Sequence, residues 1–344
     1  MTGRRLVRAA GGVRLEPQPP ADPGRAHVRM LAAGVCGTDV QIAARTRPDV
    51  ASVLGHEGVG VLDGRLVVFN PVGTRDPLSI LGHSYDGVFR SWVPVSEVPE
   101  DALCTVEPVE PVWLLALCEP LATVLYSWEL IAARALLDVG IWGAGPIGVL
   151  QAAVAAERGH RVTVVQPSAS RRAWLRTQPL GAGVAAVASA QAVPRGLDVA
   201  VLCVPKPVMA SAVREAADAL APEGLMVLVP GLEPEAAAPT FADPGVGAVR
   251  RRHELGRLGE PIVARTLAGK WLRVTGHRGT SLEQLRAASE RLRRDPSRYA
   301  ALVTHRVGPD AAVALINARC AGRARDERGG EIVKVVIDFA APDG

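Results

Sequence analysis

The chain has 344 residues, of which 48% are hydrophobic and 22% are charged, and this composition predicts a globular protein of two domains. Its net charge is +4, but the arginines are scattered and only 4% of residues are aromatic, so we expect no nucleic-acid partner. No continuous apolar run reaches the roughly 18 residues that span a bilayer, and no apolar core follows the N-terminal arginines, so we expect neither a membrane partner nor a signal peptide.

Residues 1–127 are rich in proline, glycine and valine and carry short alternating runs. The runs at 27–35, 64–72 and 87–95 are bounded by glycine and proline, which predicts strands. We therefore expect an irregular, mostly β domain in this part of the chain.

From residue 128 on, apolar runs of strand type alternate with helical patterns, which predicts a doubly wound parallel sheet over 128–277. The predicted strands are 138–145, 160–166, 182–188, 197–204, 225–231 and 272–277, the last of which closes the sheet. The predicted helices are 146–159, 168–177 and 207–224. The remainder, 278–344, carries an amphipathic helix at 281–295 and a final strand at 331–339, and we expect it to return to the first domain.

Gly143, Gly145 and Gly148 have the spacing G-x-G-x-x-G between a predicted strand and a predicted helix. In that context the first glycine permits a tight turn, the second lets the backbone approach a pyrophosphate, and the third packs helix against strand. The helix begins at Pro146 and Ile147, and its free N–H groups can bind an anion. This predicts a Rossmann domain that binds NAD or NADP; the alternative is a glycine-rich turn without a cofactor.

The second strand of this unit ends at Gln166, where an acid usually binds the ribose 2′-hydroxyl of NAD. A neutral amide does not repel a 2′-phosphate as a carboxylate would, and Ser168, Arg171 and Arg172 could bind one. The alternative is that these arginines simply begin an exposed helix. We therefore expect NADP to be at least tolerated.

Two short glycine-rich stretches carry Cys36 with Asp39 and His56 with Glu57. Thiol, imidazole and carboxylate groups are the ligands of zinc, and a catalytic zinc keeps three protein ligands and one open position. Glu119, just before the Rossmann domain, offers a third ligand. Each residue also has a structural alternative, such as a buried cysteine or a hydrogen-bonded loop histidine. The five cysteines include no C-x-x-C pair, so a closed four-cysteine site is excluded and a reducing, cytoplasmic location is expected.

The stretches GVCGTD, GHEGVG, CEPLA and GAGPIG, and more loosely LAPEGLMVLVPG and EIVKVVIDF, resemble the zinc-containing medium-chain dehydrogenase/reductase family. They occur in the family's order and cover nearly the whole chain. The resemblance implies a mostly β, GroES-like catalytic domain beside the Rossmann domain, one catalytic zinc, NAD or NADP, and a homodimer or homotetramer.

In the sorbitol- and glucose-type members the matching residues surround the zinc, which carries over to Cys36, His56 and Glu119. Glu57 resembles an adjacent acid that approaches the metal directly or through water. Thr38 resembles the hydroxyl that passes on the substrate's proton, and Asp39 resembles the acid that orients the zinc histidine.

Most zinc-containing members also carry a lobe with four cysteines around a structural zinc, but here the corresponding interval is only VGTRDPLSIL, and the lobe is absent. The stretch that follows offers His83, Tyr85 and Asp86 as partners for substrate hydroxyls, although Tyr85 and Asp86 could instead shape a turn before Gly87. The resemblance implies oxidation of a secondary alcohol of a polyol, sugar or (amino)cyclitol to the ketone, or the reverse.

Two other functions stay open at this point. A metal-free reductase of the same fold is disfavoured by the joint presence of Cys36, His56 and Glu119. An NAD(P)-binding protein without turnover would bind the cofactor tightly but hold no metal and oxidise no alcohol.

Overall fold

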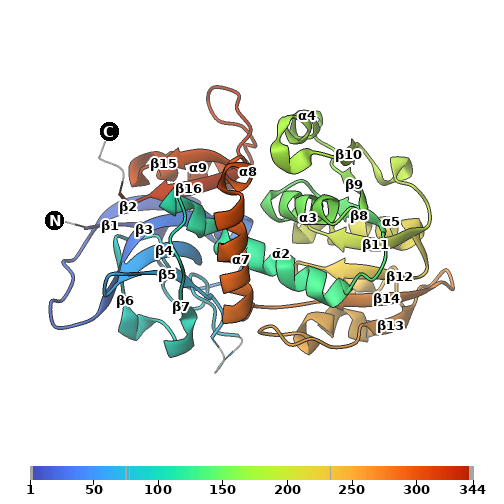
Figure 1. Cartoon of the computed structure of the whole chain (residues 1–344), viewed down its shortest axis with the longest axis horizontal. Coiled ribbons are helices and arrows are strands. Elements are labelled where there is room, and N and C mark those ends of the chain that lie inside the picture. The colour runs from blue at the N-terminus through green and yellow to red at the C-terminus, as the bar shows by residue number, and fades with distance from the viewer. Residues whose placement is uncertain (1–2, 74–75, 77, 233, 341–344) are drawn as a thin grey trace. The chain divides into compact units, whose positions relative to one another are not determined.

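The computed structural model describes residues 3–73, 76, 78–232 and 234–340 (Figure 1). It separates into two compact units, Met1–Ala122 with Gly279–Gly344, and Thr123–Arg278. The divisions thus fall at 122/123 and 278/279, where the sequence predicted 127/128 and 277/278. The predicted fold class is confirmed, because one unit is mostly β and the other contains a parallel Rossmann sheet.

The first unit contains a seven-stranded sheet in the order β15-β16-β3-β4-β5-β7, with β6 paired to β3, and a separate hairpin of β1 and β2. Its strands are β1 (Gly3–Ala9), β2 (Gly12–Gln18), β3 (His27–Val35), β4 (Glu57–Leu62), β5 (Arg65–Phe69), β6 (Trp92–Pro94), β7 (Leu103–Thr105), β15 (Val303–Val307) and β16 (Lys334–Asp338). Its helices are α1 (Gly37–Ala43), α7 (Leu282–Arg294), α8 (Pro296–Ala300) and α9 (Pro309–Cys320), and α2 (Cys118–Ile131) continues from this unit into the second.

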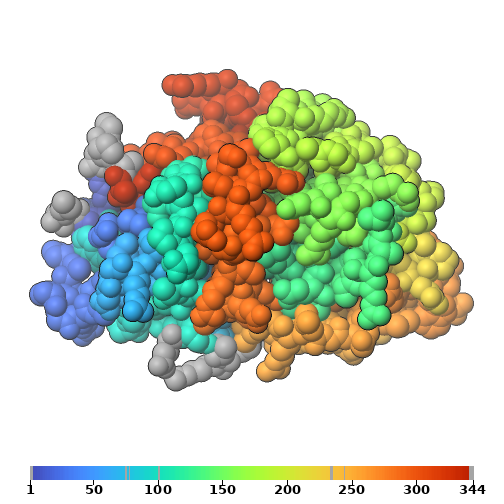
Figure 2. All heavy atoms as spheres, viewed as in Figure 1, coloured from blue at the N-terminus to red at the C-terminus, as the bar shows by residue number. Residues whose placement is uncertain are grey.

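The last strand completes the sheet of the first unit. Alternation along β3 buries Val28 and Met30, which pack with Phe69 of β5 in one apolar core. β16 lies antiparallel to β3, with Val335 opposite Val35, so residues from the two ends of the chain become neighbours. α7 begins at a Ser281 capping box and lies on the surface, as the orange ridge of Figure 2.

The second unit contains a seven-stranded sheet in the order β10-β9-β8-β11-β12-β14-β13. Its strands are β8 (Asp138–Trp142), β9 (Arg161–Val165), β10 (Val184–Val187), β11 (Leu197–Leu202), β12 (Leu220–Leu228), β13 (Ile262–Arg265) and β14 (Trp271–Gly276). Its helices are α3 (Pro146–Glu157), α4 (Ala169–Thr177), α5 (Met209–Ala219) and α6 (Pro234–Ala237). All pairs from β10 to β14 are parallel, as a doubly wound sheet requires.

Two predicted elements of this unit differ from the structure. Helix α5 ends at Ala219 instead of 224, because Pro222 cannot continue a helix and the residues before it extend into β12. The sheet also does not close at 272–277: β13 pairs antiparallel outside β14. β13 has only four residues, too few for a clear alternating pattern in the sequence.

Within the described residues, one segment, Val112–Ile131, is long and apolar enough to cross a membrane by length and composition alone. Of its most apolar window, 78% is buried inside the structure, as in the core helix of a globular protein.

Candidate metal centre and nucleotide loop

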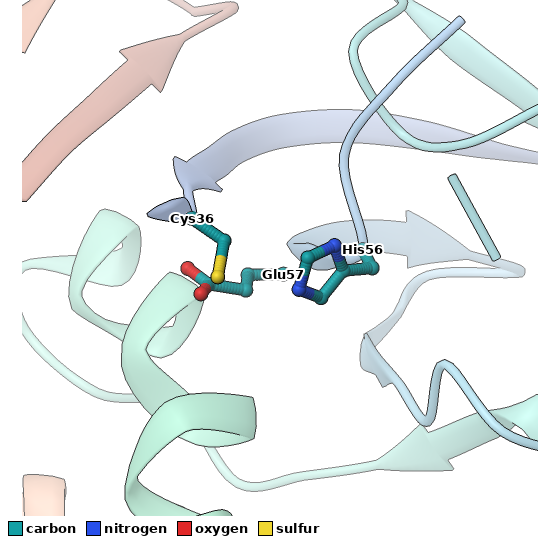
Figure 3. Close-up of side chains that lie close together, drawn as sticks. All are labelled: Cys36, His56 and Glu57. Atoms are coloured by element: carbon teal, nitrogen blue, oxygen red, sulfur yellow. The ribbon is translucent and has the colours of Figure 1, made fainter. Parts of the chain in front are cut away.

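Cys36, His56 and Glu57 come together where two neighbouring strands of the first unit meet (Figure 3). Cys36 directly follows β3, and Glu57 begins β4; because these strands are antiparallel with Gly34 opposite Glu57, the two segments are adjacent. One ligand atom from each side chain lies within 4.8 Å of the others. Thiol, imidazole and carboxylate groups are the ligands of zinc, so the chemistry of this set is that of a candidate zinc site.

Asp39 ties the two donor segments together. It is fully buried in the first turn of α1, and its carboxylate accepts the backbone N–H of Cys36 at 2.8 Å and of Gly55 at 3.1 Å. Its Oδ1 also lies 3.3 Å from Nδ1 of His56, within ion-pair distance. An acid placed here fixes the orientation of a metal-binding imidazole.

Asp39 and His56 shift each other's pKa in the directions that favour their charged forms. Burial alone would raise the pKa of Asp39, but His56 and the N–H of Cys36 outweigh it, and the pKa lies below its usual range. Burial alone would lower the pKa of His56, but the Asp39 carboxylate raises it well above its usual range.

The prediction from sequence missed Lys334 of β16. Its side chain is 1% exposed, and its ammonium donates to Oε2 of Glu57 and, at 3.1 Å, to the carbonyl of Val35. Burial would lower the pKa of Lys334, but Glu57 and Cys36 outweigh this and raise it. The sequence does contain a feature that indicates a buried ion pair, which is the single lysine inside the apolar run IVKVVI. A charge in a buried strand needs a partner of opposite charge.

Two further residues were predicted for the metal centre, Glu119 as the third ligand and Thr38 as the proton relay. Glu119 is half-buried in the first turn of α2, and among the described residues neither compact group of possible metal ligands contains it. Thr38 is half-buried in α1, two residues after Cys36. Their predicted roles as third ligand and proton relay stay predictions.

His83, predicted as a substrate contact, belongs to a second group with Asp39 and His56. Its ring packs edge-on against His56, with centroids 4.9 Å apart, and its Nδ1 lies 3.6 Å from Asp49. Burial, and then the charge of His56, lower the pKa of His83 to about 4, so it is neutral at pH 7. The structure therefore places His83 against the metal-centre histidine.

Tyr85 and Asp86 were also predicted to contact substrate hydroxyls, and in the structure both have surroundings within the protein that can be described. Oδ1 of Asp86 accepts the backbone N–H groups of Ser52 and Val53 at 2.8 and 2.9 Å, so it shapes the loop before His56. The hydroxyl of Tyr85 is buried and has no hydrogen-bond partner within the part of the chain that the structure describes, and burial raises its pKa to about 12.

The glycine loop of the second unit has the geometry expected of a pyrophosphate site. Gly143 follows β8 with φ at +101°, where a side chain would be strained. A Cβ on Gly148 would overlap the carbonyl oxygen of Gly143, whereas a Cβ on Gly145 would meet nothing within 4 Å. Gly148 therefore serves internal packing, and Gly145 keeps space open at the start of α3, where Pro146 and Ile147 form the first turn.

The residues predicted to set the preference between NAD and NADP are Gln166, Arg171 and Arg172. Their side chains make hydrogen bonds to the backbone of the glycine loop and of the segment after β9. Nη1 of Arg171 donates to the carbonyl of Ala144 inside the glycine loop at 3.2 Å, and Arg172 donates to the carbonyl of Gln166 at 2.6 Å. The Gln166 side chain accepts the N–H of Ser168 at 3.1 Å. Both arginines thus bind backbone oxygens beside the site predicted for the ribose.

Comparison with known proteins agrees with this geometry. A family model described as "NADP oxidoreductase coenzyme F420-dependent" matches residues 138–228, the first half of the Rossmann sheet and part of its second. An L-galactonate-5-dehydrogenase of Escherichia coli (strain K12) is 26% identical over 44% of this chain and 51% of its own length. An L-threonine 3-dehydrogenase of Anaeromyxobacter sp. (strain Fw109-5) is 29% identical over 40% of this chain and 48% of its own.

Among solved structures, a dehydrogenase of Sinorhizobium meliloti 1021, assigned as zinc-binding and bound to NADP, matches with a TM-score of 0.70 and 21% identity, over 98% of this chain and 99% of its own. The chain resembles the medium-chain dehydrogenases and shares their fold. It spans about half the length of the curated relatives that it matches. The similarity that the sequence motifs indicated is therefore confirmed at the level of fold.

Proposed function

We propose that this protein is a zinc-dependent, NAD(P)-linked dehydrogenase that oxidises a secondary alcohol of a polyol, sugar or (amino)cyclitol to the ketone, or catalyses the reverse. The observation that carries the proposal is that Cys36 and His56 bring a thiol and an imidazole together, with the Glu57 carboxylate beside them and all three within 4.8 Å, in a chain that also has a Rossmann glycine loop. The names of the two curated relatives, which are dehydrogenases of L-galactonate and L-threonine, support a hydroxyl-bearing small molecule as substrate.

In this proposal Cys36 and His56 hold the zinc, with Glu119 as the third ligand implied by the resemblance. A zinc ion held there would supply a Lewis acid that lowers the pKa of the substrate hydroxyl, and a bound NAD or NADP would supply the hydride acceptor. Asp39 keeps His56 oriented, and Thr38 passes the hydroxyl proton toward solvent. The N–H groups at the start of α3, beside Gly145, bind the cofactor's pyrophosphate.

Metal analysis combined with a substrate screen tests this function. We expect about one zinc per chain, because the cysteines of a second site are absent, and reduction of NAD or NADP with polyols, sugars or inositol-like rings. A site built for several hydroxyls rejects analogues that lack them by up to about four or five orders of magnitude. Preference for hexanol or benzyl alcohol would refute the substrate class.

The same experiment separates the alternatives. Turnover with no zinc in active enzyme would identify a metal-free reductase. Tight NADPH binding with neither zinc nor turnover would identify a cofactor-binding protein that is not an enzyme. The mutation Gln166→Asp should shift the cofactor preference toward NAD, because a carboxylate repels the 2′-phosphate.

A further inference from the structure

The ammonium of Lys334 lies directly behind the candidate metal centre and joins both donor segments. It donates to the carbonyl of Val35, the residue before Cys36, and to the carboxylate of Glu57, the residue after His56. Lys334 and Glu57 are both almost fully buried, at 1% exposure. The carboxylate that belongs to the compact donor group is therefore already bound to a cation that the chain itself provides.

The backbone is shaped to hold this pair. Gly34 of β3 stands opposite Glu57, and a Cβ on Gly34 would overlap Oε2 of Glu57 and lie 3.1 Å from both Cε and Nζ of Lys334. Gly34 does not have a positive φ, so its lack of a side chain is explained by the space that the ion pair occupies. The pair is thus a built feature of the three strands β4, β3 and β16.

We propose that Lys334 is the internal counter-ion of the metal centre: it keeps Glu57 out of the ligand set and weakens the affinity of the centre for metal. The inference rests on the metal centre of the proposed function. A carboxylate oxygen that is bound to an ammonium is less available to a metal, and a buried positive charge repels a divalent cation in a low-dielectric site. Lys334 is accordingly a positioning residue, and its removal should make Glu57 a metal ligand.

Titration of the metal-free full-length protein with Co²⁺ tests the proposal, because cobalt reports its ligands by absorption. In the wild type we expect a thiolate-to-cobalt charge-transfer band from Cys36, and Glu57→Gln should leave the d–d spectrum unchanged. Lys334→Met should bind Co²⁺ at least about tenfold more tightly, since repulsion is lost and a carboxylate is freed. Its d–d bands should change, as an added ligand requires, while the matched control Lys334→Arg should behave like the wild type.

A purely structural role for Lys334 predicts a different result. Lys334→Met would then lower the melting temperature equally with and without Co²⁺ and leave affinity and spectrum as in the wild type, which would overturn the proposal. A change of the d–d spectrum on Glu57→Gln in the wild-type background would also overturn it, because Glu57 would already be a ligand. Absence of any charge-transfer band in the wild type would instead refute the metal centre itself.

A buried carboxylate without its partner could prevent Lys334→Met from folding. The comparison of Glu57→Gln with the double variant Glu57→Gln/Lys334→Met then carries the test, because the double variant contains neither buried charge. It should bind Co²⁺ at least about tenfold more tightly than the single variant, since only the ammonium has been removed. Equal affinities would show that Lys334 does not oppose the metal.

Discussion

The nucleotide loop of the second unit and the candidate metal centre of the first unit differ in how far apart their parts lie in the chain. In the loop, Gly143, Gly145 and Gly148 follow one another within six residues, and Arg171 reaches Ala144 across 27 positions. In the metal centre, Lys334 binds Glu57 across 277 positions. The nucleotide loop is thus packed within one short segment, whereas the candidate metal centre also contains an ion pair between distant segments.

Loss of a proposed metal ligand should have the largest effect on zinc binding and turnover. Cys36→Ser removes the only sulfur of the donor group, so the purified variant should hold little zinc. Its turnover should fall by more than about a hundredfold, since changes to the residues around a metal ligand alone cost 10–100-fold in metal affinity or activity. Elemental analysis and kcat/KM with the best alcohol measure it. Cys320→Ser is the matched control, because Cys320 lies in α9 outside the donor group. Full zinc content in Cys36→Ser would contradict the assignment.

The second prediction concerns the glycine whose missing side chain leaves open space. A methyl group on Gly145 would touch nothing within 4 Å, so Gly145→Ala should leave the melting temperature unchanged. It should raise the Kd for NADPH by about tenfold or more, because the methyl takes space beside the N–H groups of α3. Isothermal titration with NADPH measures this change in Kd. An unchanged affinity would contradict the prediction that the pyrophosphate binds beside Gly145.

Gly148→Ala is the counterpart that acts through packing. A Cβ there would overlap the carbonyl oxygen of Gly143, and backbone atoms cannot move aside as a flexible side chain can. We expect a loss of stability of about 1–3 kcal/mol, the usual range for overpacking. Urea unfolding without cofactor measures it. Equal stability of Gly148→Ala and Gly145→Ala would show that the two glycines do not have separate roles.

How much the sequence could predict follows from the same difference. The spacing of Gly143, Gly145 and Gly148 between a strand and a helix predicted the loop and the Rossmann sheet, because these contacts are local. The Cys36 and His56 stretches were found as separate motifs. The partner of Glu57 could not be found in this way, since nothing local connects residue 57 with residue 334.

The roles predicted for His83, Tyr85 and Asp86 as substrate contacts stay predictions, and these residues illustrate the same limit. His83, Tyr85 and Asp86 were chosen for their polarity, but polarity does not tell whether a side chain faces a ligand or its own backbone. Asp86 binds the N–H groups of Ser52 and Val53, and His83 packs on His56. Only the fold decides which of these uses a polar residue has.

A pH-dependent prediction tests the burial of His83 beside His56. Its folded pKa is lowered to about 4, so as pH falls below about 6.5 the unfolded chain binds a proton before the folded chain does. The stability that neutral His83 contributes is therefore full above about 6.5 and is lost progressively toward pH 4. In metal-free protein, His83→Gln should flatten this part of the curve of melting temperature against pH. Parallel curves for the two proteins would contradict the burial of a neutral imidazole.

The smallest expected effect concerns an unpaired amide next to the nucleotide loop. Gln151 of α3 is fully buried, and neither its oxygen nor its nitrogen has a hydrogen-bond partner within the described residues. Burying an unsatisfied polar group costs about 1–3 kcal/mol, so Gln151→Met, which keeps the length of the side chain, should stabilise the protein by about 1 kcal/mol. For a unit of this size that raises the melting temperature by about 2–4 °C.

Gln284→Met is the matched control in the first unit. The Gln284 side chain accepts the N–H of Ser281 at 3.0 Å in the capping box of α7, so the loss of this hydrogen bond should destabilise the protein by about 1 kcal/mol. A loss of stability in both variants would mean that a buried water satisfies Gln151, and the nucleotide unit would then contain a polar network as specific as that of the metal centre.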